Sequence, residues 1–183
     1  MTVARLAAVL LGALVSADAL GAAALPAPLR EVRPELQPVG AATLRWFGLH
    51  VYDTALYAPE GAYTTNGTAA LSIRYAISIK HKRLLETTLK EWRRMGKGTE
   101  SQRARWVQLL EPLWPDLKPG DSLTAFIRRD GATAFYFGDR LLGEIPDPAF
   151  GPVFFAIWLG DNCRYPDVRD GLLGLKAADR KGR

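Results

Sequence analysis

The stretch that decides the fold runs from Gly120 to Leu159, GDSLTAFIRRDGATAFYFGDRLLGEIPDPAFGPVFFAIWL. It predicts three short strands joined by tight turns and followed directly by an aromatic-rich helix. Asp130–Gly131 is typical of a hairpin turn, because glycine adopts positive φ values without steric cost. Gly138–Asp139 provides a second reversal before a third strand over Arg140–Ile145. We therefore expect an antiparallel meander that ends in a helix.

The helix after the meander carries its own start and stop signals. Asp147–Pro148 is expected to open it, with Asp147 as the N-cap. Gly160 is expected to close it in the left-handed conformation that glycine favours. Apolar side chains recur between these signals at helical spacing: Phe150, Phe154, Ile157 and Trp158.

Three more strands are predicted earlier in the chain, at Thr43–Phe47, Leu49–Ala58 and Ala70–Ser78. The first two are separated by Gly48 alone, so they form either one bent strand or a tight pair. The third alternates apolar and polar residues, which is typical of a half-buried strand.

Two helices are predicted between these strands and the meander. The first places Leu85, Leu89 and Trp92 on one face and ends near Gly96. The second begins with a capping box at Thr99. Strands, two inserted helices, a meander and closing helices indicate an α+β domain, with helices covering one face of a largely antiparallel sheet.

The first 24 residues have the pattern of a secretory signal peptide. Arg5 precedes the apolar run Leu6–Val15, and small residues suited to cleavage lie at 17–19 and at 22–24. The run is shorter than the roughly 20 residues of a spanning helix, which disfavours the alternative of an uncleaved anchor. We expect an exported, periplasmic protein with a proline-rich lead-in over 25–39, one domain over 40–176 and a polar tail over 177–183.

Positive charge is concentrated in one segment. Between Lys80 and Arg105 nine Lys or Arg outnumber three Glu, whereas the whole chain carries +5. Such a segment attracts anions of any class, or it is an ordinary solvated helix face. Trp92 and Trp106 fall on the apolar stripes and not among the exposed cations, so nucleic-acid binding is not expected.

Several classes of site are disfavoured by composition. The single cysteine, Cys163, excludes an internal disulfide and a four-thiolate zinc site. The two histidines, His50 and His81, have no carboxylate or second histidine at ligand spacing. No nucleotide-binding loop or nucleophile elbow occurs. We therefore expect neither a metal nor a cofactor, and the sequence leaves the oligomeric state open.

One group of residues stands out as a candidate site. Arg45 lies on a predicted strand, with Tyr52 and Tyr57 on the next. A guanidinium that projects into a cleft can bind a carboxylate or stabilise an oxyanion, and a neighbouring phenol adds a donor. The alternative is that Arg45 reaches into solvent from an edge strand and the tyrosines pack with their hydroxyls in water.

Four segments together resemble bacterial chalcone isomerase-like proteins. They are GAATLRWFGLHVYDTALYAP (Gly40–Pro59), WRRMG (Trp92–Gly96), LWPDLKPGDSL (Leu113–Leu123) and FYFGDRLLGEIPDPAFGPVFFAIWLG (Phe135–Gly160). The resemblance covers nearly everything after the leader. It implies an open-faced β-sandwich, in which a long antiparallel sheet is backed by helices and a ligand cleft lies between them.

The resemblance also implies site residues. The family's enzymes use a strand Arg, a following strand Thr, and a helix with Tyr, Lys and Asn. Arg45 corresponds to the Arg, Tyr52 replaces the Thr, and the helix positions hold Lys80, Arg83 and Thr87. Because most of the catalytic set is altered, we expect a non-catalytic protein that binds a small, mostly apolar, anionic ligand such as a fatty acid. Its ligand-binding residues would be Arg45, Tyr52, Arg83 and Thr87, with Arg45 at the acidic end.

Two alternatives remain open. One is an isomerase, or intramolecular lyase, in which Arg45 and Tyr52 stabilise an oxyanion. The other is an accessory protein whose basic helix, Lys80–Arg94, docks on an anionic membrane or on a partner.

Overall fold

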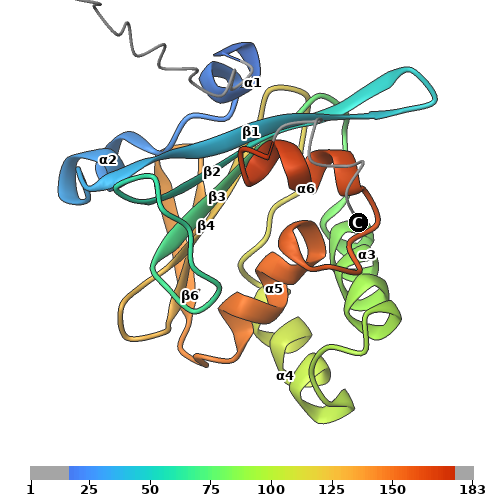
Figure 1. Cartoon of the computed structure of the whole chain (residues 1–183). Coiled ribbons are helices and arrows are strands. Elements are labelled where there is room, and N and C mark those ends of the chain that lie inside the picture. Colours follow the sequence, from blue (N-terminus) through green and yellow to red (C-terminus); the bar gives the residue numbers. More distant parts are fainter. Residues whose placement is uncertain (1–16, 176–183) are drawn as a thin grey trace, which may run out of the picture.

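The structure is a computed structural model, and it describes residues 17–175 of the chain (Figure 1). Its centre is one six-stranded antiparallel sheet whose strands follow one another in chain order. The strands are β1 (Leu36–Trp46), β2 (Leu49–Pro59), β3 (Ala69–Tyr75), β4 (Ser122–Ile127), β5 (Thr133–Phe137) and β6 (Arg140–Ile145). The predicted α+β class is confirmed, and so is the meander formed by β4, β5 and β6.

Four helices cover one face of the sheet (Figure 1): α3 (His81–Arg94), α4 (Glu100–Leu110), α5 (Phe150–Leu159) and α6 (Pro166–Leu172). The main core lies between them and the sheet. Trp92, Trp106 and Phe150 are fully buried there and meet edge to face, with ring centroids 5.4 to 5.9 Å apart. Both tryptophans therefore belong to the core, as their positions on the apolar stripes predict.

The opposite face carries a second, smaller core. Helices α1 (Ala17–Ala22) and α2 (Ala27–Val32) pack there against small residues of the sheet. Ala23 is fully buried, the Tyr57 hydroxyl donates to its carbonyl at 3.2 Å, and the Ser72 hydroxyl donates to the Ala24 carbonyl at 3.1 Å. Residues that the sequence assigns to a leader and a lead-in thus form part of the fold.

The prediction that residues 25–39 form only a lead-in to the domain is wrong, because α2 and the beginning of β1 lie within them. Pro28 lies in the first turn of α2, where a missing N–H leaves no hydrogen bond unmade. Pro38 lies on the edge strand β1 beside an irregularity at Val39, the setting in which a strand accepts proline. Of the other terminal predictions, the apolar run Leu6–Val15 and the tail over 177–183 lie outside the described residues.

The helix signals are partly confirmed. The capping box between Thr99 and Gln102 is present, and Gly96 follows α3 with φ of 64°. Gly160 follows α5 in an extended conformation, so its left-handed assignment is wrong. Asp147 is not the N-cap of α5, because the helix begins at Phe150, later than predicted, and its N-cap is Ala149. The Asp147 carboxylate accepts from Trp106 Nε1 at 2.9 Å and from the Ala149 N–H at 3.0 Å in the turn before the helix.

The β1–β2 hairpin is the longest projection of the molecule (Figure 1). Its two turn residues, Phe47 and Gly48, both have positive φ, 48° and 80°, and join the paired residues Trp46 and Leu49. This turn geometry matches the twist of the strands and favours Asn-Gly. Phenylalanine at its first position is strained by about 1–2 kcal/mol. The segment Trp46–Leu49 is called the hairpin tip below.

Of the helices between residues 17 and 175, none combines the length and the apolar character needed to cross a bilayer. Within the same range, no three His, Cys, Asp or Glu side chains gather in a way that could hold a metal ion.

Candidate functional site

Arg45 does not point into the interior, which corrects the expectation from sequence. Its neighbour Leu44 faces the helices, so strand alternation directs Arg45 to the other face. Its cross-strand partner is His50, whose Nε2 lies 3.1 Å from Asp53 Oδ2 on that same face. Arg45 is exposed and makes no ion pair with any residue from 17 to 175. It therefore cannot meet a ligand held between sheet and helices.

Tyr52 faces the helices and is buried. Its hydroxyl accepts a hydrogen bond from Trp158 Nε1 on α5 at 3.1 Å, and its ring meets that of Tyr75 edge to face at 6.1 Å. Burial raises the pKa of the Tyr52 phenol well above its ordinary value, and the Trp158 hydrogen bond offsets this only partly. Tyr52 is therefore a neutral group that links the sheet to α5.

Arg83 and Thr87 do not line the interior either, and their predicted place beside a ligand is wrong. Both side chains are exposed, and Arg83 Nη1 lies 3.5 Å from Glu86 Oε2 on the outer face of α3. The next residues along the helix, Leu84 and Thr88, face inward instead. Lys80, placed at a catalytic position by the same resemblance, is exposed and pairs with Asp116 at 2.8 Å.

On the helix side, a cavity of about 10 Å³ lies between the sheet and helices α3 and α5. Strands β3, β4 and β5 form its floor. Leu84 and Thr88 of α3, Phe154 and Trp158 of α5, and Trp114 from the segment before β4 form its walls. A cavity of this volume has room for about one water molecule.

Four residues that line this cavity carry a hydrogen-bonding side chain: Tyr75, Thr88, Trp114 and Trp158, of which Trp158 donates to Tyr52. Trp114 and Tyr75 are the two large donors among the others. The Trp114 side chain is buried, yet its Nε1–H has no hydrogen-bond partner among the described residues. Tyr75 is buried on the floor, and burial, with the neighbouring Tyr52 as a smaller cause, raises the pKa of its phenol well above the ordinary value. Both groups are neutral donors. An unpaired buried donor costs about 1–3 kcal/mol, which an acceptor within hydrogen-bond distance of it would recover.

The cavity has no charge of its own. Of the residues from 17 to 175 that line it, none is Lys, Arg, His, Asp or Glu. Removing a carboxylate from water without a cation or several donors is strongly unfavourable. The arrangement therefore suits an apolar molecule with one or two neutral acceptor atoms.

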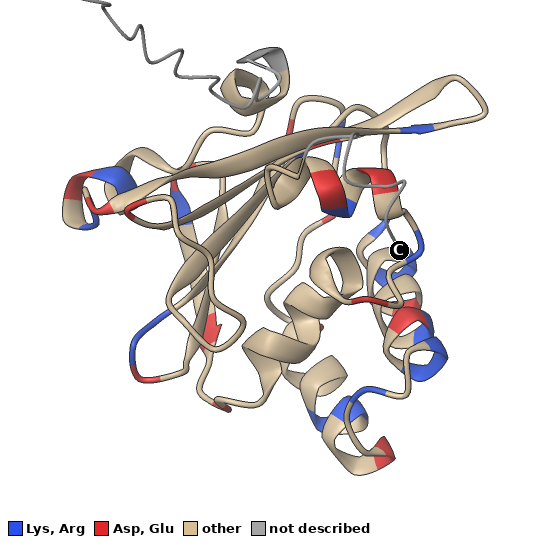
Figure 2. Ribbon diagram, viewed as in Figure 1, with Lys and Arg blue, Asp and Glu red and all other residues tan. Residues whose placement is uncertain are grey.

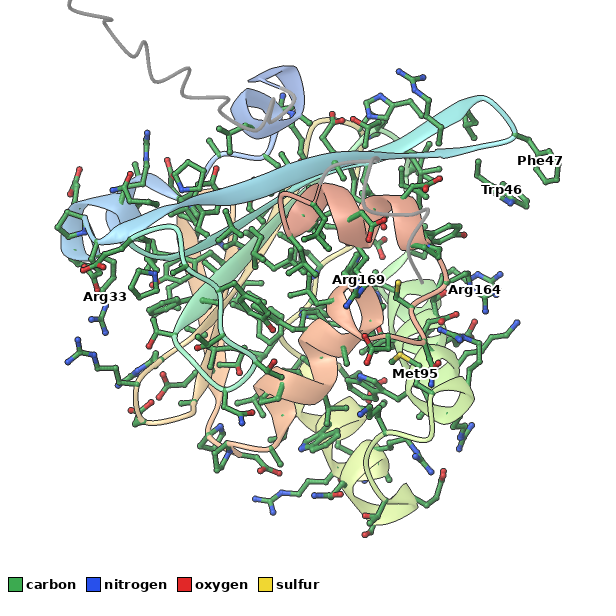
Figure 3. The ribbon with its side chains drawn as sticks, in the orientation of Figure 1. Arg33, Trp46, Phe47, Met95, Arg164 and Arg169 are labelled. Carbon is green, nitrogen blue, oxygen red and sulfur yellow. The ribbon has the colours of Figure 1, made fainter. Side chains whose placement is uncertain are left out.

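An ion cluster around a buried carboxylate connects α3 to the C-terminal part of the chain. Glu91 of α3, with a side chain 8% exposed, accepts from Arg164 Nη2 at 2.6 Å and from Arg94 Nε at 2.7 Å. Burial acts to raise the pKa of Glu91, but the hydrogen bonds from Arg164 and Arg94 together outweigh it and lower that pKa. Arg164 lies between α5 and α6, so the cluster ties α3 to the segment that follows α5 (Figure 3).

Sequence reasoning did not identify Trp114, Tyr75, Leu84 or Thr88 as site residues. Trp114 and Leu84 carry the ordinary signature of core residues, and an unpaired indole N–H has no signature in sequence at all. The inward-facing residues of α3 could have been identified from sequence, because the apolar stripe of this helix contains Leu85 and Trp92. The helix faces follow from that stripe, and Thr88 lies on it whereas Thr87 does not.

Comparisons with known proteins agree with this geometry at the level of the fold. A family model described as chalcone isomerase-like matches residues 17–174. An uncharacterized protein of Haemophilus influenzae is 30% identical over 139 residues, which are 75% of this chain and 68% of that protein. The crystal structure of a fatty-acid binding protein of Arabidopsis thaliana superposes with a TM-score of 0.58 at 9% identity. The match covers 76% of this chain and 87% of that one.

Proposed function

This chain belongs to the chalcone isomerase-like family, and from that premise we propose that it is a non-catalytic protein that binds a small, mostly apolar ligand between its sheet and helices α3 and α5. The observation that carries the proposal is the aromatic cavity with an unpaired indole donor, Trp114 Nε1–H, in its wall. A site with apolar walls and few polar groups is the usual form of a small-molecule pocket.

The ligand's polar group is neutral in this proposal. Trp114 and Tyr75 supply uncharged donors, and the cation expected at the acidic end, Arg45, lies on the other face of the sheet. An acyl ester, or a fatty acid in its protonated form, matches these donors better than a carboxylate. The fatty-acid binding protein with the same fold supports an acyl chain as the ligand's apolar part.

Ligand entry requires the cavity to widen, because about 10 Å³ does not hold an acyl chain. Phe154 and Trp158 are the wall residues of α5, and Trp158 is partly exposed. Their movement away from β3 opens the space without breaking the sheet. The free energy of opening lowers the apparent affinity, since the competent state is a minor one in the free protein.

Export to the periplasm is part of the proposal. It is supported by the apolar run and small residues of the N-terminal segment. The isomerase alternative depends on Arg45 and Tyr52 acting together on one substrate. No observation favours it, because the two side chains lie on opposite faces of the sheet.

The test compares a long-chain fatty acid with its methyl ester by displacement of a fluorescent apolar probe. We expect saturable binding of the ester, and binding of the acid that strengthens as the pH falls and the carboxyl becomes protonated. Trp114→Phe should weaken ester binding, relative to the hydrocarbon probe, by about fivefold, the equivalent of one hydrogen bond.

Two matched variants serve as controls. Trp92→Phe removes another buried indole N–H that has no partner in the described part of the chain and does not line the cavity, so it should leave the ester affinity unchanged. Arg45→Ala should also have no effect. A loss of affinity in Arg45→Ala, or a preference for the acid at neutral pH, would contradict the proposal; so would an absence of saturable binding.

A further inference from the structure

The hairpin tip presents large apolar side chains to solvent at the most remote point of the fold. Phe47 is 92% exposed, Trp46 is 58% exposed and Leu49 is 55% exposed. The two rings meet edge to face with centroids 5.1 Å apart, and Figure 3 shows both at the end of the hairpin. Clustered exposed apolar residues mark an interaction site, whereas scattered single ones do not.

The presence of phenylalanine at this turn also indicates an interaction site. Phe47 has φ of 48°, a conformation that favours asparagine or glycine and disfavours bulky side chains. Neither backbone conformation nor contact with water favours phenylalanine there. Strained backbone conformations are concentrated at functional positions.

Positive charge lies at the same end of the molecule. Arg45, exposed and without an ion-pair partner within residues 17–175, directly precedes the tip. The Ala76 N–H bonds the Val51 carbonyl at 2.9 Å beside the tip, and α3 begins five residues further on at His81. Helix α3 contains five Lys or Arg and two Glu, and all five cations are exposed whereas Glu91 is buried. Figure 2 shows the blue segments along this helix.

We propose that the hairpin tip inserts into the interface of an anionic lipid bilayer, with Arg45 and the outer face of α3 held against the headgroups. Tryptophan and phenylalanine at the end of a protruding hairpin suit the boundary between headgroups and acyl chains. Lys and Arg close to an anionic surface add attraction that salt screens. The proposal is independent of the cavity and of what it binds.

The test is co-sedimentation with vesicles, either of phosphatidylcholine alone or of an equal mixture with phosphatidylglycerol. The full chain should bind the mixed vesicles more strongly, and salt should weaken that binding. Phe47→Asp should lower the partition coefficient by about tenfold or more, since it removes the phenyl ring that would enter the bilayer and adds a negative charge that anionic headgroups repel. All variants share the same N-terminal segment, so differences between them belong to the tip.

Val32→Asp is the matched control, because Val32 is 69% exposed and lies on α2, far from the tip along the sheet (Figure 1). It should bind like the unaltered chain. Brominated lipids should quench part of the tryptophan fluorescence of the unaltered chain. In Trp46→Phe this quenching should be absent, whereas binding to the vesicles should remain.

Three results would overturn the proposal. Binding of Phe47→Asp to vesicles as strong as that of the unaltered chain would place the lipid contact elsewhere. If the unaltered chain self-associates in the absence of vesicles and Phe47→Asp abolishes this self-association, the tip contacts a second copy of the chain instead. Binding to neither vesicle type would exclude a bilayer partner.

Discussion

Buried tyrosines on the helix side of the sheet couple the stability of the fold to alkaline pH. Burial raises the pKa of Tyr52 and of Tyr75 well above the ordinary value, and it raises the pKa of Tyr57 on the other face to about 12. In the unfolded chain these phenols lose their protons near pH 10. Above that pH the folded state binds more protons than the unfolded state, so stability falls as the pH rises.

The corresponding prediction concerns Tyr75→Phe. The free energy of unfolding of the unaltered protein should decline above about pH 10, and Tyr75→Phe should show a shallower decline because one titrating group is gone. Urea unfolding at a series of alkaline pH values measures both slopes. Equal slopes in the two proteins would show that Tyr75 ionises as readily in the fold as in the unfolded chain.

Single-residue predictions from sequence failed where they required the direction of a side chain. Arg45 was expected inside because of a family resemblance, yet its neighbour Leu44 occupies the inward position. Arg83 and Thr87 were expected beside a ligand, and the structure has Leu84 and Thr88 there. A shift of one residue rotates a helical position by about 100°, so a small alignment error moves a residue from the inside to the outside.

At the scale of elements, Glu91 holds α3 against the segment between α5 and α6. Glu91→Gln keeps the shape and removes the charge that Arg94 and Arg164 share. We expect a loss of about 1–3 kcal/mol in the free energy of unfolding, because charge-assisted hydrogen bonds become neutral ones and two cations remain close together. Chemical denaturation measures the loss.

The pH dependence of Glu91 has the opposite sign to that of the tyrosines. Its pKa is lowered in the fold from 4.5, so its contribution is complete above that pH and is lost as the pH falls below it. Glu91→Gln should lack this part of the acid sensitivity. Glu86→Gln, on the exposed face of the same helix, should change neither the stability nor its pH dependence.

Elements with strong local signals could be predicted from sequence. The meander was predictable because glycine turns and alternating residues delimit each strand, and Arg140–Ile145 has the predicted bounds. β1 begins at Leu36, earlier than predicted, because proline on an edge strand looks the same in sequence as proline in a linker. Gly160 shows the same limit, since a glycine after a helix permits the left-handed conformation without requiring it.

At the scale of the whole molecule, the sheet has a core on each face, and the N-terminal segment supplies the second one. A cleavage at 22–24 would remove the buried Ala19 and Ala23 together with the carbonyl that accepts from Tyr57. A cleavage at 17–19 would keep almost all of that core. The family match also begins at residue 17.

We therefore predict that the chain beginning at Ala17 is more stable than the chain beginning at Leu25. The difference should be about 2 kcal/mol or more, because Ala19, Ala23 and two side-chain hydrogen bonds are lost in the shorter form. Thermal unfolding of the two forms tests this. With the export proposed above, the mature N-terminus determined by mass spectrometry should lie near residue 17, and a mature chain that begins at Leu25 would refute the assignment.

The layered fold could be predicted from sequence, but the state of its interior could not. Phe135, Phe154 and Trp114 were all recognisable as apolar, yet their packing decides whether a cleft of ligand size or a cavity of about 10 Å³ remains. Such packing depends on rotamers and on distances between elements, which composition and spacing do not specify.

Photo-crosslinking with a fatty-acid methyl ester that carries a diazirine tests most directly whether the ligand lies between sheet and helices. Peptide mapping should find saturable labelling on β3, on α3 around Leu84 and Thr88, and on α5 around Phe154 and Trp158, and unlabelled ester should compete with it. Labelling confined to the hairpin tip or to α1 and α2, or labelling that does not saturate, would contradict the assignment of the cavity as the binding site.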